Sequence, residues 1–164
     1  MAAMLTIILP AKALEVLRRR SRFEDKSLEE LVSVILLKSL RMGDPRDRAE
    51  LHLGLCRKYL REGGNLLRKE DYTQASEKYW GAASQMVKAV AAKRGVDIKS
   101  HGELHGFVAK LRKEIDDAEI GRLWRSAIAL HQNFYENWLP PEMVKEASDD
   151  VERFVERLEE IART

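Results

Sequence analysis

The sequence predicts a mainly α protein in which one short β-strand and two helices precede an up-down helical bundle. Apolar residues recur at helical spacing through most of the 164 residues. Capping residues and Pro or Gly breaks divide that pattern into segments of ordinary helix length. Only residues 5–9, LTIIL, predict a strand, because they are aliphatic or β-branched and Pro10 ends them.

The first two helices follow that strand directly. Pro10 suits the first turn of a helix that reaches about Phe23. Ser27 then begins a second helix, with Glu30 three residues later completing a capping box, and Gly43 ends it. We therefore expect residues 1–43 to form a strand–helix–helix module.

The remaining residues, 44–164, predict a bundle of about five helices. Each helix has a recognisable start or stop in the sequence. These signals are Asp44 with Pro45, the capping pairs Asp71 with Gln74 and Ser100 with Glu103, the stop at Gly95, a helix from about Ala118 to Trp138, and the break at Pro140 and Pro141 before the last helix.

Composition limits the class of protein. The hydrophobic fraction of 45% supports a core, whereas a charged fraction of 34% and the lack of a long apolar run argue against a membrane protein. The net charge is only +2, so no overall field demands nucleic acid. The single cysteine, Cys56, excludes a disulfide within one chain and is expected in the core. Abundant Glu, Lys and Arg are typical of a thermophile. Residues 4–9 are too short for a signal peptide, so we expect a cytoplasmic protein.

The lone strand has a consequence for assembly. Its backbone donors and acceptors have no partner in the chain, and a single strand is not stable alone. The simplest partner is the same strand of a second copy, so we expect a homodimer. The alternative is an N-terminus that is disordered or packed on helices.

The segment LTIILPAKALEVLRRRSRFEDKSLEELVSVILLKSL resembles a ribbon-helix-helix module of the CopG/Arc/MetJ type over about residues 4–42. The resemblance implies that paired strands enter the DNA major groove and that the second helix binds a phosphate at its start. Met4 and Ile8 occupy reading positions but cannot hydrogen-bond to bases, so such a ribbon is also suited to being covered by protein. The nucleic-acid-binding residues implied are Thr6 as a base reader, Ser27 at the phosphate, and Arg18, Arg19, Arg20 and Arg22 as a source of charge.

Two further segments, QASEKYWGAASQMVKAVAAKRG and LHQNFYENWLP, resemble the archaeal PaREP family over about residues 47–162. That family is similar to the HEPN group of helical bundles, many of which are ribonucleases marked by an arginine and, a few residues later, a histidine. Arg125 and His131 match this motif, with five residues between them. The resemblance implies that two protomers bring these pairs together in a dimer cleft.

The chemistry of RNA cleavage without a metal suits these residue types. A histidine titrates in the range needed to move a proton, and an arginine stabilises charge on the phosphate. Tyr135, one turn after His131, is placed to contact a base or phosphate, and Glu136 to orient a ring or an arginine. These four residues are the catalytic candidates: Arg125, His131, Tyr135 and Glu136.

A structural role for His131 is the competing interpretation. Positions six apart on a helix are separated by about 120°, so Arg125 and His131 do not share one face. His131 shares a stripe with Trp124 and Tyr135, which is typical of a bundle-facing surface. A histidine in such a stripe is often a hydrogen-bonded core residue.

We therefore expect a homodimeric, HEPN-like, nucleic-acid-associated protein that cleaves RNA without a metal, in a defence or toxin–antitoxin setting. The alternatives are a non-catalytic scaffold that partners a nucleotidyltransferase, and a DNA-binding autoregulator that uses the N-terminal ribbon. No P-loop, GxGxxG or CxxC motif occurs, so we predict no cofactor. His101 and His105 are four residues apart but lack an evident third ligand, so we predict no metal site. We expect His52 on the surface.

Overall fold

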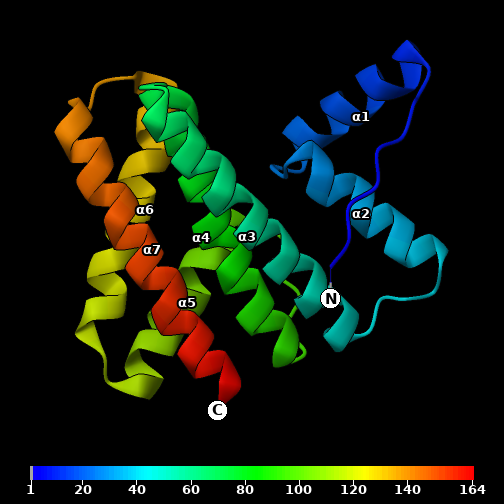
Figure 1. Ribbon diagram of the computed structural model, residues 1–164. Helices are drawn as coiled ribbons and strands as arrows, with labels where there is room; N and C mark the ends of the chain where they lie inside the picture. The colour runs from blue at the N-terminus through cyan, green and yellow to red at the C-terminus, as the bar shows by residue number, and fades with distance from the viewer. Residues whose placement is uncertain (1) are drawn as a thin grey trace.

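A computed structural model gives the structure of residues 2–164, which contain seven helices and no strand (Figure 1). Five of them, α3 to α7, form the predicted bundle, and α1 and α2 form a hairpin beside α3. No helix in this range is both long and apolar enough to cross a membrane. The helices are α1 (Ala11–Phe23), α2 (Leu28–Ser39), α3 (Pro45–Arg68), α4 (Tyr72–Lys93), α5 (His101–Ile115), α6 (Ala118–Glu136) and α7 (Pro141–Arg163).

The predicted β-strand is wrong. Residues 2–10 have no regular secondary structure, and Leu5 and Ile8 are 80% and 98% exposed. A strand needs a neighbouring strand for its backbone groups, and nothing within residues 2–164 supplies one. The mainly α prediction with a leading strand is therefore corrected to an all-helical fold.

The predicted helix starts are confirmed by their caps. Ser27, Asp44, Asp71 and Ser100 each accept a hydrogen bond from the backbone N–H three residues later. Each cap satisfies one of the amide donors that a helix leaves unpaired in its first turn. Local sequence therefore fixes where four of the helices begin.

The bundle is built around α4, which packs against α3, α5, α6 and α7. Small residues let the neighbouring helices approach it closely. A methyl group on Gly63 of α3 would lie 2.8 Å from the Tyr79 ring, and one on Gly81 of α4 would lie 3.1 Å from the Tyr59 ring. These two glycines therefore make the space in which the aromatic rings between α3 and α4 are packed.

The α1–α2 hairpin contacts the bundle mainly through the start of α2. Glu30 is 3% exposed and accepts hydrogen bonds from Lys88 Nζ at 2.7 Å and Gln85 Nε2 at 2.8 Å, both on α4. The Ser27 and Tyr59 hydroxyls are 2.5 Å apart, and Lys58 Nζ donates to the Glu29 carboxylate at 2.6 Å. One turn of α2 thus carries most of the polar contacts that dock the hairpin.

The prediction that His52 lies on the surface is wrong, because the residue belongs to this buried network. His52 Nδ1 donates to Gln85 Oε1 at 2.7 Å, and Gln85 in turn donates to Glu30. Burial lowers the pKa of His52 below its ordinary value. Burial alone would raise the pKa of Glu30, but the charge and hydrogen bond of Lys88 outweigh it, so the pKa is lowered. A neutral histidine and an ionised carboxylate are therefore the forms that the fold stabilises.

We predict that Glu30→Ala weakens docking of the hairpin by about 3–5 kcal/mol, because Lys88 would lose its buried counter-charge. The measurement is amide hydrogen exchange over α1 and α2, together with urea unfolding of the whole chain. Glu29→Ala is the matched control, since its ion pair with Lys58 is half exposed and we expect a loss within about 1 kcal/mol. Equal exchange rates in the two variants would contradict the role assigned to Glu30.

Candidate functional site

A cavity of about 720 Å³ lies between the hairpin and the bundle. This volume falls in the range of about 300–1,000 Å³ that is usual for ligand sites. The residues around the α1–α2 turn, 21–22 and 24–30, cover one side, and a stripe of α4 from Glu77 to Lys88 forms the opposite side. The start of α5 and the end of α6 close the remaining walls with His101, Leu104, His131, Phe134 and Tyr135.

His131 is held in this cavity by ring packing. Its imidazole stacks on the Trp80 indole, with centroids 4.4 Å apart and an interplanar angle of 23°, and meets the Tyr135 ring edge-on at 5.4 Å. Burial, followed by the neighbouring His101, lowers the pKa of His131 below its ordinary value. Within residues 2–164 no group hydrogen-bonds to either ring nitrogen. The lowered pKa favours the neutral imidazole.

A second histidine faces the first. The His101 and His131 ring centroids are 5.2 Å apart at an interplanar angle of 85°. His101 Nε2 lies 2.8 Å from Asp25 Oδ2, a contact that fixes the ring and leaves Nδ1 as the nitrogen without a protein partner. Asp25 lies in the α1–α2 turn with a left-handed φ of 53°. The hairpin therefore positions a histidine that belongs to the bundle.

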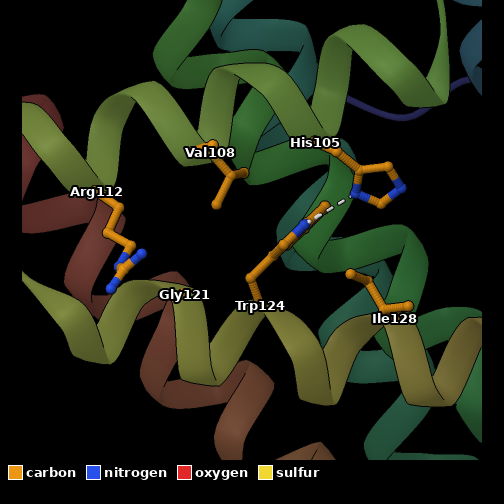
Figure 2. A pocket seen from close by; sticks show the side chains of 7 residues that line it. His105, Val108, Arg112, Gly121, Trp124 and Ile128 are labelled. Carbon is orange, nitrogen blue, oxygen red and sulfur yellow. Dashed lines mark hydrogen bonds between the residues drawn. The ribbon is translucent and has the colours of Figure 1, made fainter.

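His105 lies one turn further along α5 and does not line the cavity. Figure 2 shows the Trp124 indole of α6 pointing toward His105, whose Nδ1 accepts a hydrogen bond from Trp124 Nε1 at 3.1 Å. Burial, followed by His101, lowers the pKa of His105. Val108 and Ile128 line the same small groove between α5 and α6, with Arg112 at its other end (Figure 2). His105 therefore joins α5 to α6, and its ring centroid lies 6.4 Å from that of Trp80.

The four predicted catalytic residues fall into two groups. His131 and Tyr135 line the cavity. Arg125 and Glu136 are exposed and are not among the residues that line it. The reason is the helical geometry of α6, which turns position 125 about 120° away from position 131.

The residues predicted to bind nucleic acid are also divided. Arg22 and Ser27 line the cavity, but the Ser27 hydroxyl already caps α2 and contacts Tyr59. Thr6 is exposed in the irregular N-terminal segment. The other arginines, Arg18, Arg19 and Arg20, are exposed on α1, where Arg20 pairs with Glu24 at 2.5 Å.

Sequence reasoning missed Asp25, Trp80 and the facing arrangement of His101. The only sequence signal was the presence of His101 near the start of α5, which by itself indicated nothing beyond a weak metal motif. Residues 2–164 contain no group of three or more His, Cys, Asp or Glu side chains placed to hold a metal ion. Chemically, the arrangement offers two imidazoles for proton transfer, one of them oriented by a carboxylate.

Comparison with known proteins identifies the family of the chain but not an activity. No curated protein and no solved structure is similar enough to the chain to count as a match. A sequence model described as the archaeal PaREP1/PaREP8 family matches residues 51–155, which run from α3 into α7 and include Trp80, His101 and His131. The chain therefore belongs to the archaeal PaREP1/PaREP8 family.

Proposed function

We propose that this protein is a metal-independent, HEPN-like RNA endonuclease whose reaction takes place in the cavity between the hairpin and the bundle. The observation that carries the proposal is the facing pair of imidazoles, His101 and His131, with ring centroids 5.2 Å apart on the cavity wall. RNA cleavage by its own 2′-hydroxyl needs one group to take a proton and another to give one, and two histidines meet that need.

In the proposed reaction, neutral His131 takes the proton of the 2′-hydroxyl. The 2′-oxygen forms a bond to phosphorus, the bond from phosphorus to the 5′-oxygen breaks, and protonated His101 gives that oxygen a proton. The products are a 2′,3′-cyclic phosphate and a 5′-hydroxyl. The lowered pKa of His131 suits the base, and the contact between Asp25 and His101 Nε2 leaves Nδ1 to act as the acid.

Charge and stacking groups near the two histidines support the same substrate. Arg22 and Lys99 line the cavity and supply positive charge for a phosphate. Tyr135 is 68% exposed, so its ring is available to stack on a base. Arg125 lies outside this cavity, so in our proposal it acts on the substrate only if it comes from a second chain.

We also propose that the protein is a homodimer. The N-terminal residues Met4, Leu5, Ile7 and Ile8 are exposed together, and Val16 and Phe23 add to the exposed apolar surface of the hairpin. Exposed apolar side chains gathered on one segment favour protein association. The same exposed residues also suit the second candidate function, a non-catalytic scaffold that binds a partner protein.

The nuclease proposal predicts cleavage of unstructured RNA in EDTA and its loss in His131→Ala and His101→Ala. We expect the cleavage rate of each variant to be lower than that of wild type by about 10²–10⁴-fold, the usual contribution of a general acid or base. His105→Asn is the matched control, because it keeps a hydrogen-bond acceptor near Trp124 outside the cavity. We expect a far smaller loss than in His101→Ala or His131→Ala, limited to the effect of His105 on the pKa of His131. Cleavage that survives in His131→Ala with an unchanged melting temperature would refute the assignment.

The same mechanism predicts a bell-shaped dependence of kcat/KM on pH. His131 must be neutral to take a proton, and its pKa is lowered from the ordinary 6.5. Activity should therefore persist below pH 6.5 and decline only when His131 becomes protonated at still lower pH. A profile whose acidic limb has its midpoint above 6.5 would show that His131 is not the base.

The dimer proposal predicts a dimer by light scattering for the full chain and a monomer after deletion of residues 2–9. Ile8→Ser should also weaken the dimer, since Ile8 is the most exposed of these apolar side chains. Lys12→Ser, in the first turn of α1, serves as a control that changes charge without removing apolar surface. A full-length chain that is monomeric across the accessible concentration range would rule the dimer out.

A further inference from the structure

The surface of α1 carries positive charge that the fold does not neutralise. Five of its thirteen residues are Lys or Arg and one is Glu, so α1 has a net charge of +4 in a chain whose net charge is +2. Arg18, Arg19 and Arg22 are exposed, and none of them forms an ion pair within residues 2–164. Arg20 differs, because its guanidinium contacts the Glu24 carboxylate at 2.5 Å. The three unpaired residues form an arginine stripe.

The end of the helix explains only part of this charge. Cations in the last turn of a helix are favoured by the unpaired carbonyl groups there, and Arg20 and Arg22 lie in the last turn of α1. Arg18 and Arg19 lie before that turn, where the effect fades. Arg18 and Arg22 are four residues apart, a spacing at which two like charges repel each other and destabilise a helix. An anion bound to both side chains would remove that repulsion.

The arginine stripe leads to the cavity. Successive helical residues are turned by about 100°, so Arg18 and Arg22 lie about 40° apart on one face and Arg19 lies about 60° from Arg22. Arg22 lines the cavity, and so does Lys99 just before α5, whose ammonium group also lacks an ion pair within the described chain. In Figure 1 the end of α1 points toward the bundle and its start points away. The unpaired positive charge of the cavity therefore continues outward along α1 for about 6 Å, the rise over four residues.

We infer that the arginine stripe binds the phosphodiester backbone of RNA at the mouth of the cavity. The inference rests on the proposed nuclease function for the identity of the polyanion, and it adds a binding surface outside the cavity. A guanidinium group can donate two parallel hydrogen bonds to one phosphate, so unpaired arginines in a row suit a chain of phosphates. Such contacts position a nucleic acid without reading its bases.

An anionic membrane surface is the other polyanion that a basic helix can contact. A helix that lies on a membrane inserts apolar side chains among the lipids, on the face opposite its charges. The large apolar side chains exposed on α1 are Val16 and Phe23. Phe23 lies about 100° around the helix from Arg22, so the face that leads to the cavity is not the apolar one. The place of Arg22 on the cavity wall therefore favours RNA over a membrane.

The salt dependence of binding tests the arginine stripe apart from catalysis. The probe is a short, mixed-sequence RNA in which fluorine replaces every 2′-hydroxyl, so that no nucleophile is present. Each phosphate contact to a single strand contributes about 0.7 to the slope of log Kd against log salt concentration. We expect the double variant Arg18→Gln/Arg19→Gln to raise the Kd and to lower that slope by about 1.4. Its melting temperature should not change, because both side chains are exposed and Gln is a good helix former.

The matched control is the double variant Lys110→Gln/Arg163→Gln. It also removes two positive charges, from side chains that are 75% and 76% exposed on α5 and α7 and do not line the cavity. We expect its slope to stay close to that of wild type. Equal slopes in the two double variants would mean that only overall charge matters, and an unchanged slope in the Arg18→Gln/Arg19→Gln variant would mean that the stripe makes no contact; either result would overturn the inference.

Two further measurements separate this inference from its alternatives. Vesicles that contain phosphatidylserine replace the RNA in the same salt series, and stripe-dependent binding to vesicles without binding to RNA would overturn the inference in favour of a membrane. His131→Ala should bind the RNA as wild type does, because His131 acts in the reaction and not in the arginine stripe. A lowered slope in Arg18→Gln/Arg19→Gln beside unchanged cleavage by His131→Ala would support the stripe and refute the nuclease assignment.

Discussion

The buried carboxylate of Glu30 is the interaction on which the rest of the site depends. An ionised group away from water is stable only when its partners are all in place, and here Lys88 and Gln85 supply them from α4. Gln85 is itself held by His52 of α3, so one charge joins α2, α3 and α4. Any displacement of α2 would break several of these hydrogen bonds together, which gives the hairpin one specific position on the bundle.

That position creates the cavity and part of its chemistry. Docking of α2 also places the residues just before it against the bundle. Among these, Asp25 contacts His101 and Arg22 lines the cavity. The bundle alone would carry two histidines on adjacent helices. With the hairpin in place, the contact with Asp25 fixes the orientation of His101, and partial burial lowers the pKa of His131. The hairpin is thus part of the candidate site.

The parts of the fold that the sequence predicts well are those decided locally. A cap such as Ser27 or Asp71 bonds to an amide three residues away, so its effect can be inferred from a few letters. The strand at residues 5–9 was wrong because β-propensity needs a neighbouring strand, which residues 2–164 do not contain. His52 was misplaced for a related reason: its burial depends on Gln85 and Glu30, which are distant in sequence. Asp25 carried no local signal, and His101 indicated only a weak metal motif, because only the docking of α2 onto α4 brings Asp25 to His101.

The geometry of α6 bears on whether Arg125 and His131 can act together within one chain or only across two chains. On a single helix the two residues diverge by about 120°, and His131 enters the cavity while Arg125 faces solvent. If the motif acts within one chain, the second proton-transfer group must come from another helix, and His101 is the group that the fold presents. If Arg125 takes part in the reaction, it must come from a second protomer and enter a cavity that the first protomer's hairpin already covers. The first arrangement needs no rearrangement of the docked hairpin, and for that reason the two-histidine mechanism is the simpler account of this cavity.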